Sequence, residues 1–266
     1  MGKYDSSLTR VVPIFDALMD RDPTGCSWLP VILKIGSFSS RGFNGLTINS
    51  LIDGHGRWWG RQERQLDPPK ALLRWLIMNV KKPMSEACWG SDETRNKREL
   101  LVAGHPETRA EALLLLESRP AQRAWYVLEG QSRPDAYLET ERLILVIEGK
   151  RTERESTTTT NWMRRRSQIL RHMDASWEIR GNKKVFGTML VEGPGGAEAV
   201  TPSEHWQKEA ESQIKPDMID ASLPHRTPVE RKQIAEGFLG VATWQRLCSE
   251  LDLPWPSIAN IRQTVI

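Results

Sequence analysis

Several features that would identify a protein class are missing from this sequence of 266 residues. Its three cysteines, Cys26, Cys88 and Cys248, are isolated, which argues against a disulfide framework or a zinc cluster. Its longest aliphatic runs have about five residues, whereas roughly 20 are needed to cross a bilayer, so no transmembrane helix is expected. The first ten residues lack the apolar segment of a secretion signal. We therefore expect a cytoplasmic protein without membrane association.

Common cofactor-binding motifs are missing as well. Neither a P-loop nor a G-x-G-x-x-G is present, so no built-in ATPase or dinucleotide site is expected. The five histidines are scattered, without the H-x-x-x-H or Cys/His spacing of a zinc site. Any catalytic chemistry must therefore come from other side chains.

The charge is small overall but unevenly distributed. The formal net charge is +3, yet residues 142–171 contain eight Lys or Arg and three acids, a local net charge of +5. The rest of the chain therefore sums to −2. A positive field concentrated on one short stretch is typical of a protein that binds a polyanion.

Hydrophobic patterning predicts an α/β fold with a central mixed sheet flanked by helices. The segment at 143–147 is aliphatic on both faces, which places it in the middle of a sheet that is covered on both sides. It forms a hairpin with the segment before it. The predicted order is helix, strand, strand, strand, helix, strand, over residues 106–118, 124–128, 135–140, 143–147, 161–177 and 184–191.

Two further regions flank this core. Residues 1–95 are predicted to be mostly helical, and residues 197–266 to form a helical extension after the core at 96–196. The segments Thr201 to Glu204 and Thr227 to Glu230 both have the pattern of a helix N-terminal capping box. Within the first region, residues 54–61 mix glycine, arginine and tryptophan, a composition that fits either a nucleic-acid contact or a packed turn.

Two short motifs stand at the ends of the predicted hairpin. Pro134-Asp135 opens its first strand, and Glu148-Gly149-Lys150 closes its second, so both motifs meet at one end of the sheet. Glu148 and Lys150 are two residues apart on a strand, so their side chains leave the same face. Carboxylates are ligands that Mg²⁺ prefers. A lysine beside the metal can orient an attacking water or neutralise charge that develops on phosphorus.

This arrangement resembles the PD-(D/E)XK nuclease superfamily over about residues 100–195, including uncharacterised bacterial members with the same RTE and threonine-rich segment after E-x-K. The resemblance implies a restriction-endonuclease-like core and a metal-dependent endonuclease that hydrolyses phosphodiester bonds. It favours DNA over RNA as the substrate, and Mg²⁺ as the cofactor, with Mn²⁺ able to replace it. Asp135 and Glu148 would be the metal ligands, and Lys150 a catalytic residue.

Members of this superfamily often add a glutamate from the first core helix and a polar residue from the helix after E-x-K. Glu111 is our choice for the first role, because it lies within the amphipathic body of residues 106–118. Glu107, Glu117 and Glu129 are alternatives. Gln168 fits the second role, on the helix that follows the motif.

Basic side chains after the motif are candidates for contacts with a nucleic-acid backbone. Such contacts give affinity that depends on salt and not on base sequence. Arg151 points to the face opposite Lys150, where it suits a phosphate contact or an ion pair. The full set of candidates is Arg151, Arg164, Arg165, Arg166 and Arg171.

Several alternatives stay open on the sequence alone. The chain could be an inactive nucleic-acid-binding module of the same fold, an RNA-directed nuclease, or an interaction protein whose basic helix binds an acidic partner. The sequence does not decide between endonuclease and exonuclease action, nor between a monomer and a homodimer. Base specificity, pathway and an unidentified protein partner are equally undetermined.

Overall fold

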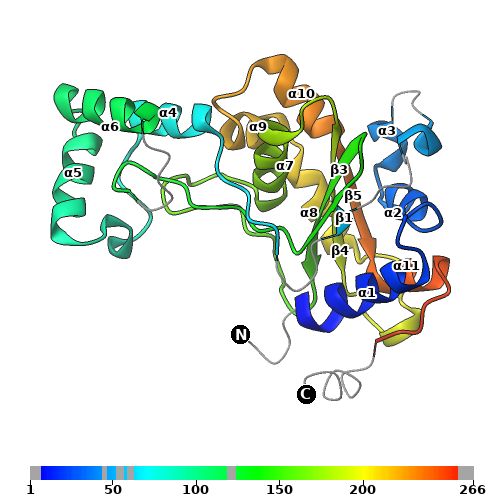
Figure 1. The fold of residues 1–266 in the computed structure, drawn as a ribbon. Helices are drawn as coiled ribbons and strands as arrows, with labels where there is room; N and C mark the ends of the chain where they lie inside the picture. Colours follow the sequence, from blue (N-terminus) through cyan, green and yellow to red (C-terminus); the bar gives the residue numbers. More distant parts are fainter. Residues whose placement is uncertain (1–6, 44–46, 52–56, 59–62, 119–123, 257–266) are drawn as a thin grey trace, which may run out of the picture.

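A mixed β-sheet forms the centre of the protein (Figure 1). The computed structural model describes residues 7–43, 47–51, 57–58, 63–118 and 124–256. The sheet has the strand order β1-β2-β3-β4-β5, in which β2 and β3 are antiparallel and β3, β4 and β5 are parallel. The strands are β1 (Arg57–Trp58), β2 (Ala136–Glu139), β3 (Leu143–Lys150), β4 (Lys184–Val191) and β5 (Phe238–Thr243). The expected α/β class with a mixed sheet is confirmed.

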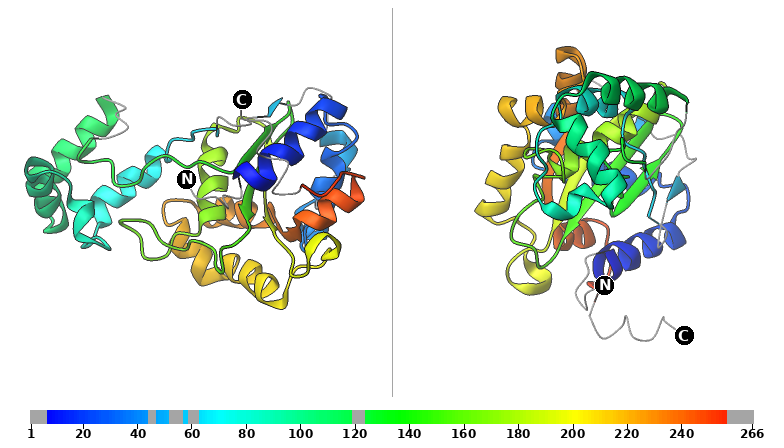
Figure 2. Two further views of the ribbon diagram at one scale, coloured as in Figure 1. Left: turned by 90° about the horizontal axis from the view of Figure 1, so that it is seen from below. Right: turned by 90° about the vertical axis from the view of Figure 1, so that its left-hand side faces the viewer.

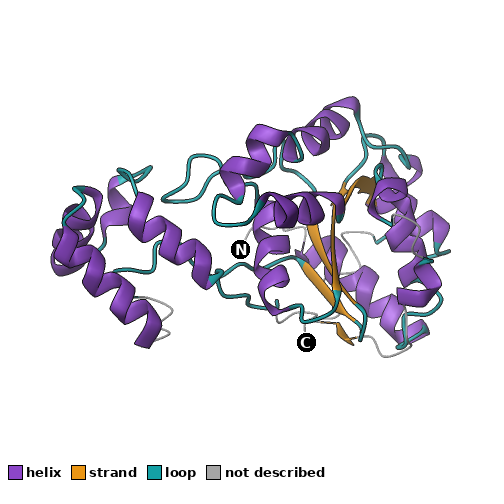
Figure 3. Ribbon diagram, turned by 90° about the horizontal axis from the view of Figure 1, so that it is seen from above, coloured by secondary structure: helices purple, strands orange, loops and turns teal. Residues whose placement is uncertain are grey.

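Strand β3 lies between two hydrophobic cores, as its aliphatic sequence predicts. Leu143, Leu145 and Ile147 belong to one core, and Ile144 and Val146 to the other, because successive side chains point to opposite faces. The first core includes α1 (Val12–Arg21), α2 (Leu29–Ile35) and α11 (Trp244–Glu250). The second includes α7 (Gln168–Ile179) together with α8 (Glu204–Gln213), α9 (Pro216–Ser222) and α10 (Pro228–Glu236). Helices therefore cover both faces of the sheet (Figure 3).

The two regions that were expected to flank the core both contribute residues to these layers. Phe15 and Trp244 lie in the same core as Leu145, although they come from the two expected flanking regions. The short helix α3 (Ser39–Gly42) leads toward β5, where Phe38 N donates to Leu239 O over 2.9 Å. Strand β5 itself falls in the stretch that was expected to be helical, which corrects that part of the expectation. Its six residues are all buried beside β4.

Three helices form a separate group that we call the helical lobe: α4 (Lys70–Asn79), α5 (Asp92–Val102) and α6 (Pro106–Ser118). The lobe stands away from the sheet in Figure 1 and in the left view of Figure 2. It has its own core, in which Leu76, Leu101 and Ala112 pack with Tyr126 and Met163. The lobe is inserted between β1 and β2 in the sequence, and its two connections pair through a bridge between Leu66 and Ser132.

The structure corrects two expectations, for the helix at 106–118 and for the strand at 124–128, because both segments belong to the lobe. The helix at 106–118 has the expected bounds, but it packs on α4 and α5 and not on the sheet. Residues 124–128 form no strand; their apolar character reflects burial of Tyr126 and Leu128 in the lobe. Strand β2 is flanked instead by β1 on one side and by β3 on the other. The rest of the segment at 54–61 lies outside the described residues.

Helix α7 begins at Gln168, seven residues later than expected. Ser167 is its N-cap, and the serine hydroxyl accepts from Leu170 N. The preceding residues instead fold back on the threonine-rich stretch: Arg166 N donates to Thr158 O, and Gln168 N to Thr157 O. The expected capping box at Thr227 and Glu230 is present at the start of α10. At the start of α8 the N-cap is Ser203, and not Thr201 as the expected box requires.

A buried ionic cluster joins α7 to the segments around it. The Arg166 side chain is 0% exposed and bonds to Glu129 and Asp174, each at 2.9 Å. Asp174 also accepts from Arg226 at 2.8 Å. Burial would raise the pKa of Asp174, but Arg166, His225 and Arg226 together hold it well below its ordinary value. The cluster therefore fixes α7 against the turn at 129 and the segment between α9 and α10.

No helix in the described ranges is long and apolar enough to span a membrane.

The ionic cluster leads to a prediction about stability. We expect Arg166→Ala to lower the free energy of unfolding by ~3–5 kcal/mol, because Glu129 and Asp174 would remain buried without their main partner. The neighbouring Arg165→Ala is the matched control: Arg165 pairs with Asp217 but is 45% exposed, so its loss should cost under about 1 kcal/mol. Urea denaturation of both variants measures the difference, and equal stabilities would contradict the prediction.

A candidate active site at the end of the hairpin

Asp135 and Glu148 lie opposite each other at one end of the sheet. Strand β2 pairs with β3 in the register Ala136 to Ile147, so the next position along the hairpin sets Asp135 across from Glu148. Residues directly opposite in an antiparallel pair share a face and have Cβ atoms about 5 Å apart. The Asp135 carboxylate is fixed by Gly149 N, which donates to Oδ2 over 2.7 Å. The hairpin thus brings the two expected metal ligands together.

Lys150 completes this arrangement on the same face as Glu148. Its Nζ lies 2.8 Å from Glu148 Oε1, and both side chains are under 10% exposed. Burial would lower the pKa of Lys150, but the Glu148 carboxylate outweighs that effect and raises it above the ordinary value. The amine is therefore held as an ammonium beside Glu148, where it supplies positive charge.

Helix α7 contributes two side chains to the same cluster. Gln168 Oε1 accepts from Lys150 Nζ over 3.2 Å, which places Gln168 where the sequence predicted it. His172 Nε2 is 2.9 Å from Glu148 Oε2. Burial would raise the pKa of Glu148, but the His172 hydrogen bond and the charge of Lys150 lower it instead. Glu148 is therefore ionised and held through both of its oxygens.

The pKa of Asp135 is shifted in the opposite direction from that of Glu148. Burial raises the pKa of its carboxyl well above the ordinary value of 3.8, and the negative charge of Glu148 raises it further. The hydrogen bond from Gly149 N and the charge of Lys150 only partly offset these effects. Glu63, which follows β1, is a further acid whose charge acts on Asp135. The site has an excess of negative charge on the side of Asp135.

This donor set fits Mg²⁺ with few protein ligands. Among the residues that the structure describes, no group of three or more His, Cys, Asp or Glu is placed to hold a metal ion. Asp135 and Glu148 would therefore be the protein ligands, and water or substrate oxygens would supply the rest. Mg²⁺ is commonly bound in this way, through one or two carboxylates while it keeps several waters. The pairing of β2 with β3 brings two acids together, and a positive charge between them would relieve the repulsion that raises the pKa of Asp135.

The expected glutamate from the first core helix lies elsewhere. Glu111 is in the helical lobe, where its Oε2 is 2.5 Å from Lys97 Nζ. Glu107 and Glu117 are on the same helix, and Glu117 pairs with Lys70 at 2.6 Å. Glu129 belongs to the buried ionic cluster. The packing of α6 in the lobe keeps its three glutamates away, and Arg166 holds Glu129, so none of the four joins Glu148.

The five expected arginines have different environments. Arg164 and Arg165 are exposed in the segment before α7. Arg166 is fully buried in the ionic cluster, so its expected contact with a nucleic-acid backbone is wrong. Arg171 donates to the carbonyls of Gly130 and Gln131, at 2.9 and 2.8 Å. Arg151 forms an ion pair with Glu192, with 3.1 Å between Nε and Oε2, which is one of the two roles expected for it.

Three residues of this neighbourhood were not singled out from the sequence. His172 contacts Glu148, Ser132 contacts His172, and Glu63 acts on Asp135 through its charge. His172 follows Gln168 by four residues, so the two share a helix face, and this spacing was a signal in the sequence. No local pattern points to Ser132 or Glu63, because both reach the site through the connections of the helical lobe.

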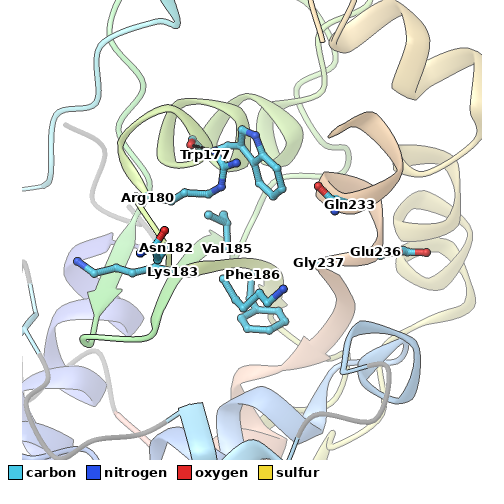
Figure 4. A pocket seen from close by; sticks show the side chains of 11 residues that line it. Trp177, Arg180, Asn182, Lys183, Val185, Phe186, Gln233, Glu236 and Gly237 are labelled. Carbon is cyan, nitrogen blue, oxygen red and sulfur yellow. Dashed lines mark hydrogen bonds between the residues drawn. The ribbon is translucent and has the colours of Figure 1, made fainter. Parts of the chain in front are cut away.

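One hollow on the described surface lies at the other end of the sheet. It has a volume of about 410 Å³ and is lined by Trp177, Arg180 and Gln233, among others (Figure 4). It adjoins the beginning of β4, whereas Lys150 pairs with the end of that strand at Val191. Glu236 is the single acid on its lining, so it offers no pair of carboxylates.

Comparisons with known proteins give no further assignment. A scan of family models and searches of curated proteins and of solved structures found no match for this chain.

The repulsion at Asp135 predicts a gain in stability when the charge is removed. Between pH 3.8 and its raised pKa the folded protein binds more protons than the unfolded chain, so stability falls as pH rises through this window. Asp135→Asn should therefore raise the melting temperature at pH 7 in EDTA by ~2–4 °C, the shift produced by about 1 kcal/mol. At pH 4 the gain should nearly vanish. A variant that is less stable than the unsubstituted protein at pH 7 would contradict this.

Proposed function

We propose that this protein is a metal-dependent nuclease that hydrolyses phosphodiester bonds, with DNA as the favoured substrate. The observation that supports the proposal most is the meeting of Asp135, Glu148 and Lys150 at one end of the hairpin, on a buried surface with Gln168 beside them. Two carboxylates and one ammonium at that spacing match the needs of phosphoryl chemistry, in which negative charge must be bound and stabilised.

Each side chain has a separate role in this proposal. Asp135 and Glu148 would hold Mg²⁺, or Mn²⁺ in its place, which when bound lowers the pKa of a water ligand and polarises a phosphoryl oxygen. Lys150 is an ammonium with three N–H donors that contacts Glu148 and Gln168, and it would also donate to a phosphate oxygen. Its charge would stabilise the negative charge that develops on the phosphoryl group. Gln168 orients that ammonium.

Part of the fold supports the resemblance to the PD-(D/E)XK superfamily, and one part differs from it. Support comes from the β2–β3 hairpin, followed by α7 and by the parallel strand β4, with the motif residues at the expected end. The departure concerns the beginning of the core, because α6 belongs to the helical lobe and β1 has two residues. A restriction-endonuclease-like core is therefore proposed for the hairpin, α7 and β4.

A nucleic-acid substrate is favoured over a small phosphate ester by the surroundings of the site. The segment that links Lys150 to Gln168 contains the exposed Arg154, Arg164 and Arg165. Arg133, two residues before Asp135, is exposed as well. Positive side chains therefore flank the catalytic groups on both connecting segments, where they could contact the backbone of a long polyanion.

Cleavage of plasmid DNA tests the proposal. The purified protein should nick or linearise supercoiled plasmid in Mg²⁺ or Mn²⁺ and be inactive in EDTA. Lys150→Ala should lower the rate by at least ~10²-fold, the loss that follows removal of a group that stabilises transition-state charge.

The matched control is Lys183→Ala. Lys183 also pairs with a strand glutamate, Glu139, but at the far end of the sheet, so its loss should leave the rate unchanged. DNA binding by folded protein without cleavage in any metal would support the inactive binding module instead. Cleavage of RNA alone would support the RNA-directed alternative.

Salt dependence tests the role of the exposed arginines. Replacing Arg164 and Arg165 together by alanine should make the slope of log K against log salt shallower by about two, one for each lost phosphate contact. Arg246→Ala is the control, because Arg246 is as exposed as Arg165 and also pairs with an acid, Glu250, but lies on α11. Fluorescence anisotropy with labelled DNA in EDTA measures both slopes, and an unchanged slope in the double variant would exclude this surface.

A further inference from the structure

Two buried side chains behind Glu148 continue the hydrogen-bonded chain of the site. His172 Nε2 lies 2.9 Å from Glu148 Oε2, and His172 Nδ1 lies 2.5 Å from Ser132 Oγ. The histidine is 2% exposed and the serine 1%. Because an ionised carboxylate only accepts, Nε2 is the donor toward Glu148. The series Ser132, His172, Glu148, Lys150, Gln168 is therefore continuous.

The position of His172 follows from the geometry of α7 on β3. Four residues of a helix advance by about 6 Å, and two residues of a strand by about 6.6 Å. Gln168 and His172 are four apart on α7, and Lys150 and Glu148 are two apart on β3. One helix face therefore meets both strand side chains at once, Gln168 at Lys150 and His172 at Glu148.

Ser132 is held just as firmly as the histidine that it contacts. Its backbone pairs with Leu66 in both directions, with Ser132 N donating to Leu66 O over 2.8 Å and Leu66 N to Ser132 O over 2.9 Å. These two residues belong to the two connections of the helical lobe. These backbone hydrogen bonds fix the position of Ser132 in the segment that leads to Asp135, three residues later.

We propose that His172 is a positioning residue of this site and that Ser132 fixes its ring. The imidazole holds Glu148 Oε2 while Lys150 holds Oε1, so the carboxylate cannot rotate toward Lys150 with both oxygens and keeps a single orientation. The inference rests on the proposed function, because it concerns how Glu148 is presented to a divalent cation. Groups that orient metal ligands from behind typically change metal affinity 10–100-fold when they are lost.

Asparagine and glutamine at position 172 separate positioning from packing. The glutamine amide nitrogen reaches the place of Nε2 and can still donate to Glu148, whereas the asparagine amide reaches the place of Nδ1 and can contact only Ser132. A packing role would be disturbed to a similar degree by both. His172→Gln should therefore bind Mn²⁺ within about 3-fold of the unsubstituted protein, and His172→Asn and His172→Ala should bind ~10–100-fold more weakly.

The measurement is the free Mn²⁺ signal in electron paramagnetic resonance during a titration, with plasmid cleavage followed in parallel. His105→Asn is the matched control, because His105 Nδ1 also contacts a hydroxyl, that of Thr108 at 3.1 Å, but in the helical lobe. Its Mn²⁺ affinity should be unchanged. Ser132→Ala should weaken binding about 3–10-fold, and it decides the matter if the His172 variants do not fold.

Three results would overturn the inference. The first is equal Mn²⁺ affinity in His172→Asn and the unsubstituted protein, and the second is an equal loss in the Gln and Asn variants. In both, the unsubstituted protein still binds Mn²⁺ and cuts DNA, so the proposed function would stand. The third is an unsubstituted protein that neither binds Mn²⁺ nor cleaves, which would remove the proposed function and this inference together.

Discussion

The antiparallel register of β2 and β3 is the constraint on which the site depends. It sets Asp135 across from Glu148, two acids that repel each other on a largely buried surface. Lys150 and His172 stabilise the charge of Glu148, whereas the pKa of Asp135 is raised. A shift of the register by one residue would move Glu148 and Lys150 to the other face and separate them from α7. The chemistry proposed here is therefore a consequence of strand pairing.

The site also requires that α7 lie correctly against β3, and the buried ionic cluster holds the helix in place. Asp174 lies two residues after His172 and is bound by Arg166 and Arg226 in the buried ionic cluster. Breaking such a cluster on one side is costly, because it leaves a buried charge without its partner. The cluster thus fixes the helix that presents Gln168 and His172. Stability and site geometry are coupled through this helix.

Local sequence signals predicted the elements that position the site, but not the long-range packing around it. The central place of β3 followed from its aliphatic run, and the place of Gln168 was implied by the superfamily resemblance. Glu111 was placed wrongly because a helix pattern gives its bounds and not its packing partner, and α6 packs in the lobe. Arg166 was assigned to the surface by its charge, whereas the fold brings Glu129 and Asp174 against it, and these two acids compensate for its burial.

The site is open to a direct test of whether it holds a metal. Crystals grown with Mn²⁺ and measured at the manganese absorption edge would locate the ion without reference to activity. We expect an anomalous peak in direct contact with carboxylate oxygens of both Asp135 and Glu148, with Lys150 beside them. A structure in which Mn²⁺ binds elsewhere, or in which the two carboxylates point away from each other in saturating Mn²⁺, would contradict it.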